Sequence, residues 1–91
     1  MSSPDRQQIA ASLEEFIRRR FRVTERDPER FNHEINLWEA GYVDSLGTVE
    51  VISFLESRFA IVMPANTLFV EENTTIGGLA SVVEAQLAAK R

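Results

Sequence analysis

Hydrophobic residues recur every three or four positions in three separate segments of this chain, and this spacing limits its possible folds more than any other feature. Residues spaced in this way share one face of an α-helix, which can then be buried against other helices. The alternation of a β-strand is suggested only at residues 60–64, a stretch too short to require a sheet. We therefore predict an all-α protein with three main helices, one short helix and a long loop after the first helix.

The first helix is expected to begin close to the N-terminus and to end near Phe21. Ser3 is a candidate N-cap, Pro4 suits the first helical position, and Asp5 complements the positive end of the helix dipole. The expected apolar face consists of Ile9, Leu13, Phe16 and Ile17. Residues 22–44 have no clear periodicity, and the side chains in this loop that are able to pack on the core are Phe31, Ile35, Leu37 and Trp38.

The second helix is expected to start after Asp44 and to stop before Pro64. Its predicted buried stripe repeats every three or four residues and consists of Leu46, Val49, Ile52, Leu55 and Phe59. A short helical turn is then expected to carry Leu68, Phe69 and Val70. The candidate N-caps of the last helix are Asn73, Thr74 and Thr75, and its predicted inward-facing residues are Ile76, Leu79, Val82, Val83 and Leu87.

The length of 91 residues suits a single compact domain, which we assign to residues 1–91. The chain has no cysteine, so neither a disulfide nor a cysteine-ligated metal can hold the fold together. Its N-terminal residues lack the charged and apolar regions of a signal peptide, and no apolar run is long enough to span a membrane. We therefore expect a cytoplasmic monomer.

The charge of the chain favours protein partners over nucleic acid. The net charge is −4, and the excess of acidic residues lies after residue 31. Such a surface attracts basic proteins and repels nucleic acid. The segment RRRFR, residues 18–22, is a cluster of the kind that contacts phosphates. We interpret its arginines as favourable positive charge at the C-terminal end of a helix.

The stretch AGYVDSLGTVE, residues 40–50, places Asp44 and Ser45 at a helix start and has two interpretations. Both residue types favour N-cap positions, so the pair can serve capping alone. If Asp44 is the cap, Ser45 is the first helical residue, and its hydroxyl is exposed and free to be esterified. A phosphate attached there would lie at the positive end of the helix dipole. The second interpretation makes Ser45 an attachment point.

Catalysis by the chain itself is not expected. His33, the only histidine, lies in a polar segment, and no glycine-rich nucleophile elbow surrounds Ser45. One histidine and no cysteine leave only scattered carboxylates as metal ligands. Gly77 and Gly78 lack the lysine and the spacing of a phosphate-binding loop. We predict no catalytic residue and no metal site.

The segment LWEAGYVDSLGTVEVISFLESRFAIVMP, residues 37–64, resembles the acyl carrier protein family, and the likeness continues to Leu87. The family's Asp-Ser-Leu motif falls on Asp44, Ser45 and Leu46. The resemblance implies an acyl-carrier-like four-helix bundle in which Ser45 bears 4'-phosphopantetheine. A phosphopantetheinyl transferase would bring the base and Mg²⁺ and take the arm from coenzyme A. The lack of cysteine agrees with this, because the working thiol would lie at the end of the arm.

The resemblance also implies a function: a free-standing carrier that holds an acyl or aminoacyl group as a thioester. A ligase or acyltransferase would load it, and a synthase or transferase would use the cargo. Gly47 and Arg58 stand where housekeeping fatty-acid carriers have acidic residues. The chain therefore looks closer to carriers of secondary metabolism, of the polyketide, nonribosomal peptide or antibiotic type. The alternatives are a D-alanyl or other aminoacyl carrier and an unmodified helical adaptor.

Two further expectations concern partners and cargo. Glu50, Glu56 and Gly47 are predicted to meet partner enzymes, with the two carboxylates facing basic patches. Aromatic residues are expected to fill the core beside the second helix and consist of Phe54, Phe59 and Phe69. Because protein interiors are closely packed, this favours a small cargo that stays outside the core.

Overall fold

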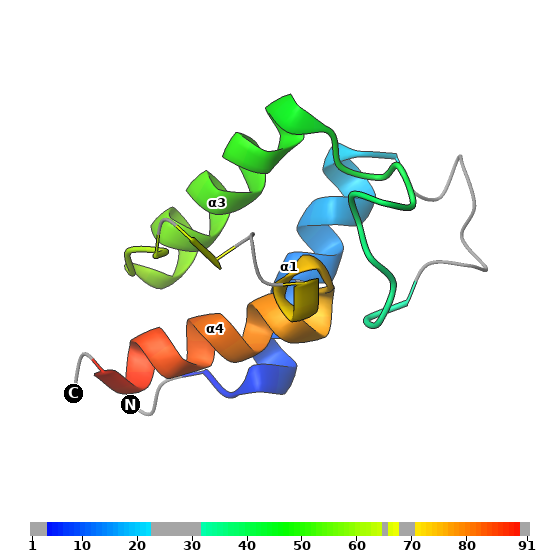
Figure 1. The fold of residues 1–91 in the computed structure, drawn as a ribbon. Coiled ribbons are helices and arrows are strands. Elements are labelled where there is room, and N and C mark those ends of the chain that lie inside the picture. The colour runs from blue at the N-terminus through cyan, green and yellow to red at the C-terminus, as the bar shows by residue number, and fades with distance from the viewer. Residues whose placement is uncertain (1–3, 23–31, 65, 68–70, 90–91) are drawn as a thin grey trace.

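The computed structural model describes residues 4–22, 32–64, 66–67 and 71–89. These ranges contain three α-helices, α1 (Arg6–Arg20), α3 (Ser45–Phe59) and α4 (Ile76–Ala89), and a 3-10 helix, η2 (Glu71–Thr74) (Figure 1). No strand occurs within the described ranges, which confirms the all-α prediction there. The predicted short turn at Leu68, Phe69 and Val70 lies outside them, and η2 begins directly after those residues.

Helix α1 begins two residues later than predicted, because its N-cap is Asp5 and its first helical residue is Arg6. The Asp5 carboxylate accepts a hydrogen bond of 2.8 Å from the Gln8 backbone N–H, and the Gln8 side chain accepts one of 2.9 Å from the Asp5 N–H. This reciprocal capping box satisfies two backbone donors at once. Pro4 therefore precedes the helix, and the predicted cap Ser3 lies outside the described residues.

Hydrogen bonds between residues close in sequence also determine the end of α3 and the start of α4. After α3, Ala60 adopts the left-handed conformation, with φ 54°, and its N–H donates to the Glu56 carbonyl. This is a common way for a helix to stop. At the start of α4, the Thr75 hydroxyl accepts a hydrogen bond of 2.9 Å from the Gly78 N–H, as expected for one of the three predicted caps.

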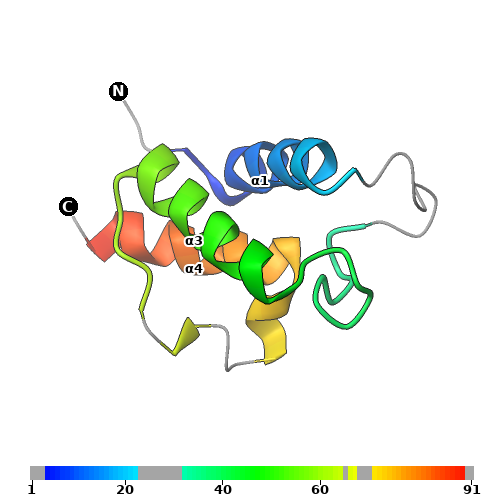
Figure 2. The same ribbon diagram turned by 90° about the horizontal axis from the view of Figure 1, so that it is seen from above.

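Helix α1 packs directly against α4, and α3 lies across this pair (Figures 1 and 2). Their facing sides form one core. The large side chains that are completely buried come from all three helices and from the connection before α3: Ile9, Leu13, Ile17, Leu37, Val51, Leu55, Ile76, Leu79 and Val83. Burying each of these stabilises the fold by about 1.5–3 kcal/mol relative to leaving it exposed.

The buried face of α3 differs from the predicted one. Leu46 and Val49 are 81% and 65% exposed, whereas the residues buried on this helix are Gly47, Val51, Leu55 and Phe59. The predicted stripe was therefore right for Leu55 and Phe59 and wrong for Leu46 and Val49. Residues 46–55 are apolar on nearly every side of the helix, so the spacing permits two stripes and only the tertiary packing selects one.

Aromatic rings fill the contact between α1 and α3. Phe16 stacks on Phe54 with 4.3 Å between ring centroids, and it meets Phe21 edge-on at 6.3 Å. Such pairs add about 0.5–1.5 kcal/mol to the free energy gained by burial. These aromatic rings form the packing contact between α1 and α3.

No helix in the described part of the chain is long and apolar enough to cross a membrane.

Candidate functional site

The Asp44-Ser45 pair lies at the exposed start of α3, where the connection from α1 enters the helix (Figure 1). Asp44 has extended backbone angles, and its carboxylate accepts a hydrogen bond of 2.7 Å from the Gly47 N–H. Asp44 is thus the N-cap, as the sequence suggested. Ser45 is the first helical residue and is exposed. Because Asp44 supplies the cap, the helix does not need the Ser45 hydroxyl.

The connection that leads to Ser45 is held in place by backbone hydrogen bonds. The Tyr42 and Val43 N–H groups both donate to the Leu37 carbonyl, at 2.9 and 3.1 Å. The Leu37 N–H donates in turn to the Thr74 carbonyl at 2.9 Å, which ties the connection to η2. Gly41 has φ 85°, the left-handed region that favours glycine. The segment before Ser45 is therefore a hydrogen-bonded turn that is anchored to η2.

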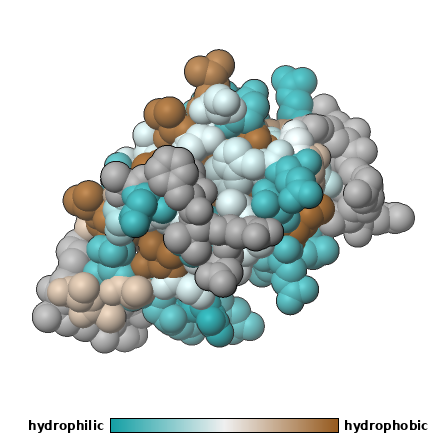
Figure 3. All heavy atoms as spheres, in the orientation of Figure 1, coloured by the Kyte–Doolittle hydropathy of each residue, from teal (hydrophilic) through white to brown (hydrophobic). Residues whose placement is uncertain are grey.

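Leu46, the third residue of the predicted motif, projects into solvent beside Ser45. Val49 follows it one helical turn later and is also exposed. In the orientation of Figure 1, hydrophobic side chains project from the edge that α3 forms (Figure 3). The surface beside Ser45 is therefore apolar.

Gly47 does not lie on the surface that was predicted to meet partners. It is buried, and a side chain there would place its Cβ 2.7 Å from a ring carbon of Phe21 and 3.1 Å from a methyl of Val43. Contacts this short require neighbouring atoms to move. The glycine thus permits the end of α1 to approach α3, and its partner-binding assignment is corrected to a packing role.

Glu50 and Glu56, the two carboxylates predicted to face partners, have contacts within the fold. Glu50 accepts hydrogen bonds of 2.6 and 3.0 Å from the guanidinium of Arg20, which joins α1 to α3. The Glu56 carboxylate accepts one of 3.0 Å from the Met63 N–H and stabilises the chain after α3. Recognition of either by a partner stays a prediction.

The neighbouring arginines of α1 also form ion pairs. Arg18 pairs with Glu14 at 2.8 Å and Arg19 with Glu15 at 3.2 Å, each one helical turn away. All three arginines Arg18, Arg19 and Arg20 lie in the last turn of α1, which agrees with the interpretation as helix-end charge.

His33 takes part in a structural contact. Its Nε2 pairs with the Glu14 carboxylate of α1, and its carbonyl accepts a hydrogen bond of 3.0 Å from the Gly77 N–H of α4. The hydrogen bond from His33, aided by Arg18, holds the pKa of Glu14 below its ordinary value despite partial burial. The contact explains His33 without a catalytic role.

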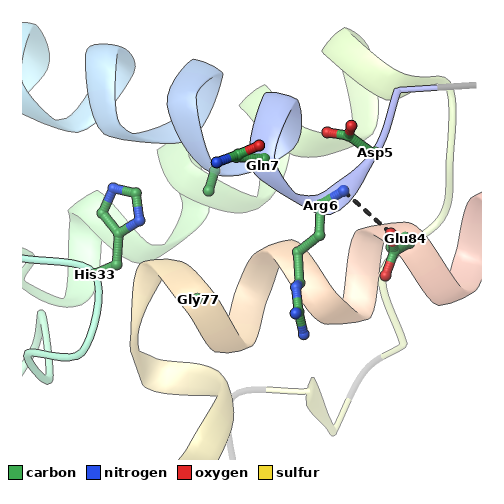
Figure 4. A pocket seen from close by; sticks show the side chains of 7 residues that line it. Asp5, Arg6, Gln7, His33, Gly77 and Glu84 are labelled. Atoms are coloured by element: carbon green, nitrogen blue, oxygen red, sulfur yellow. Dashed lines mark hydrogen bonds between the residues drawn. The ribbon is translucent and has the colours of Figure 1, made fainter.

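A polar hollow lies between α1 and α4 and includes His33 in its lining (Figure 4). Arg6 lies beside it, and the Arg6 backbone N–H donates to the Glu84 carboxylate at 3.1 Å. Ser45 and Asp44 do not line this hollow. Across the described ranges, no group of three or more His, Cys, Asp or Glu is placed to hold a metal ion.

Two site residues were not found from the sequence. Trp38 was expected only to pack, and Thr48 was not singled out, yet the Trp38 indole donates a hydrogen bond of 2.6 Å to the Thr48 hydroxyl. The available signal was the position of Thr48, four residues after Asp44, from which a threonine hydroxyl can reach the carbonyl one turn back.

Comparison with known proteins agrees with this geometry. The family described as "Phosphopantetheine attachment site" matches residues 8–83, which is most of the chain. The chain belongs to this family. Its members bear covalently attached phosphopantetheine, so this is the cofactor of the present carrier-family protein.

Two curated proteins that are similar to this chain are D-alanyl carrier proteins. That of Streptococcus suis is 46% identical over 50 residues, which cover 54% of this chain and 63% of the relative. That of Bacillus velezensis is 40% identical over 42 residues, which cover 46% of this chain and 54% of the relative. The matched segments thus cover about half to two thirds of the length of each relative. No solved structure matches the chain significantly.

Proposed function

We propose that this protein is a carrier that holds an acyl or aminoacyl group as a thioester on a 4'-phosphopantetheine arm attached to Ser45. The observation that supports the assignment most is the position of Ser45: exposed, first in α3, and relieved of capping by Asp44. Membership of the phosphopantetheine-attachment family adds the cofactor. The arm supplies the terminal thiol that the chain lacks.

In the attachment reaction, the Ser45 Oγ forms a bond to the β-phosphorus of coenzyme A. The bond from that phosphorus to the bridging oxygen breaks, and adenosine 3',5'-bisphosphate leaves. The hydroxyl proton passes to a base that the transferase supplies. The contribution of this chain is to present the hydroxyl at a fixed helix start, where the backbone dipole also favours the phosphate.

The proposed partners are a phosphopantetheinyl transferase, a loading ligase or acyltransferase and a downstream synthase or transferase. Each must approach the same end of α3. Because Glu50 and Glu56 already contact Arg20 and Met63, we propose that the apolar edge formed by Leu46 and Val49 supplies part of the contact. Burial of exposed apolar area on association is favourable.

The proposed cargo is small. Phe54 is stacked on Phe16, and Phe59 is buried against the core, while Phe69 lies outside the described residues. A long acyl chain would have to displace such packed rings, whereas a short acid or amino acid can stay on the surface. The relatives named D-alanyl carrier proteins support an aminoacyl cargo. Secondary metabolism of the polyketide or nonribosomal peptide type is the second candidate setting, suggested by the motif resemblance.

The cargo is tested by loading the arm chemically with an octanoyl or an aminoacyl group and comparing amide chemical shifts and melting temperature with the unloaded arm. We expect neither group to shift the signals of Val51, Leu55 and Phe59, which are buried. Large shifts there, with a raised melting temperature for the octanoyl form alone, would instead assign a fatty-acyl or reduced polyketide cargo.

The attachment itself is tested by intact mass after incubation with coenzyme A, Mg²⁺ and a broad-specificity phosphopantetheinyl transferase. Wild type is expected to gain one phosphopantetheinyl mass, and Ser45→Ala none. Ser53→Ala is the matched control, because Ser53 is also an exposed serine on α3. Modification of Ser45→Ala, or no modification of wild type, would contradict the proposal, and the latter would favour an unmodified helical adaptor.

A further inference from the structure

We infer that Trp38 and Thr48 are positioning residues for the attachment of the arm, through a hydrogen-bonded relay that holds the residue before Ser45. This inference rests on the proposed function, because it assigns the relay to the same serine. The relay consists of Trp38, Thr48 and Asp44 and lies entirely within the described residues.

The Thr48 hydroxyl stands at the centre of the relay. The Trp38 indole Nε1–H donates to the Thr48 Oγ1 at 2.6 Å, and this Oγ1 donates to the Asp44 carbonyl at 3.0 Å. A hydroxyl has one hydrogen to donate and lone pairs to accept with. An indole N–H can only donate, so the directions of both bonds are determined. The two hydrogen bonds therefore run in one direction, from the Trp38 indole to the Thr48 hydroxyl and from there to the Asp44 carbonyl.

Asp44 is held at two points by this arrangement. Its carbonyl accepts from the Thr48 backbone N–H at 2.9 Å as well as from the Thr48 hydroxyl. Its carboxylate accepts from the Gly47 N–H at 2.7 Å. Ser45 follows directly, so the direction in which its side chain leaves the helix depends on how Asp44 is held.

Trp38 is itself held by hydrogen bonds and by packing. Its backbone N–H donates to the Asn36 side chain at 3.0 Å, and the adjacent Leu37 N–H donates to the Thr74 carbonyl at 2.9 Å. Leu37 is completely buried, and the Trp38 side chain is half-buried against the core. The relay therefore connects the first turn of α3 to η2 and the core.

The consequence concerns the reactivity of Ser45. The first turn of a helix has fewer backbone hydrogen bonds than its interior and opens more readily. A bound transferase needs the hydroxyl in one position relative to the phosphorus that it attacks. Losing a single hydrogen bond of the relay is expected to lower kcat/KM for arm transfer about threefold to tenfold.

The experiment measures kcat/KM for arm transfer from coenzyme A by a broad-specificity transferase, with the melting temperature of each apo variant. Thr48→Val removes the hydroxyl and keeps the shape of the side chain, whereas Thr48→Ser keeps the hydroxyl. Trp38→Phe removes the indole N–H from the other end of the relay. Thr67→Val is the matched control, because the Thr67 hydroxyl donates to the Pro64 carbonyl in the connection after the opposite end of α3.

We expect Thr48→Val and Trp38→Phe to lose about threefold to tenfold in kcat/KM, Thr48→Ser to stay near wild type, and the double variant to lose no more than either single one. Thr67→Val should lower the melting temperature without changing kcat/KM. The single tryptophan gives one indole N–H signal in an ¹⁵N spectrum, and its exchange with solvent should accelerate in Thr48→Val. This exchange shows directly whether the bond is lost.

Wild-type kcat/KM in Thr48→Val, together with faster indole exchange, would overturn the inference and leave the bond a purely stabilising one. Equal losses of kcat/KM in Thr48→Val and Thr67→Val would overturn it as well, since both would then follow from lower stability. Failure of the proposed function is distinct from these results, because the wild-type chain would then take no arm at all. That result would remove the basis of the inference too.

Discussion

The ring edge of Phe21 occupies the space that a side chain on Gly47 would fill, with 2.7 Å between the Phe21 Cε1 and the position of a Cβ. Phe21 is the C-cap residue of α1, and Gly47 lies in the first turn of α3. The missing side chain thus allows the end of one helix to reach the start of the other, two residues from Ser45.

Gly47→Ala is expected to lower the free energy of unfolding by about 1 kcal/mol net, because displacing the Phe21 ring with the added methyl costs about 2 kcal/mol. The gain in helix propensity from Gly to Ala, also about 1 kcal/mol, offsets part of the steric loss. Urea unfolding measures the net change. In a Phe21→Leu background the same substitution should be neutral or stabilising. A Gly47→Ala protein about 1 kcal/mol more stable than wild type would show that the ring moves away freely, because only the gain in helix propensity would then remain.

The Arg20–Glu50 pair joins α1 to α3 and is partly exposed, with 53% and 39% of the two side chains accessible. Such pairs contribute about 0.2–1 kcal/mol at low salt and less at high salt. A double-mutant cycle with Arg20→Gln and Glu50→Gln should give a coupling in this range. The Arg19–Glu15 pair, with about three quarters of each side chain exposed, is the control and should give less. Equal couplings for both pairs would contradict a linking role.

Glu14 gives the fold a dependence on acid pH. The hydrogen bond from His33, with help from Arg18, lowers the pKa of Glu14 below its ordinary value of 4.5. A carboxylate with a lowered folded-state pKa stabilises the fold above the unfolded-state pKa, and this contribution is lost as pH falls through the folded-state pKa. The contribution of Glu14 to the free energy of unfolding should therefore be constant above pH 4.5 and decline as the pH falls below it.

The measurement is the titration of the Glu14 carboxyl carbon by NMR, in wild type and in His33→Ala. Removing the histidine should move the Glu14 pKa upward and reduce the difference in unfolding free energy between neutral and acid pH. An unchanged Glu14 pKa in His33→Ala would mean that Arg18 alone accounts for the shift.

Asp44→Ala is expected to lower the free energy of unfolding by about 1 kcal/mol, because the Gly47 N–H loses its acceptor. It should also slow arm transfer, since α3 would begin less regularly at Ser45. Asn is as good an N-cap as Asp, so Asp44→Asn should keep the stability. If Asp44→Ala unfolds at the same urea concentration as wild type, the carboxylate is not acting as a cap.

The features that could be predicted from the sequence are helix faces and helix caps, which depend on residues close to one another in the chain. The predicted apolar faces of α1 and α4 were correct, because their residues are buried or packed against the core. The cap at Asp44 and the exposed Ser45 also follow from residues that are neighbours in the chain. Ser3 was predicted as the cap of α1 because Ser and Asp both suit an N-cap, and the reciprocal bonds with Gln8 identify Asp5 as the cap.

The features that could not be predicted depend on contacts between distant segments. The exposure of Leu46 and Val49 follows from how α3 lies on the core, which the apolar spacing of that helix does not determine. The packing role of Gly47 requires Phe21, and the contact of Glu50 requires Arg20, each from another helix. The Trp38 indole bond likewise needs the turn that brings the connection back to α3.

The central claim is that Ser45 carries the arm, and the most direct test is to locate the modification in the wild-type chain. After transfer from coenzyme A, proteolysis and tandem mass spectrometry identify the peptide and the residue that gained the phosphopantetheinyl group. The account predicts that the added mass lies on Ser45 alone and that the neighbouring hydroxyls of Thr48 and Ser53 remain unmodified. Finding the group on any other residue, or finding an unmodified chain under conditions that convert a known carrier, would contradict it.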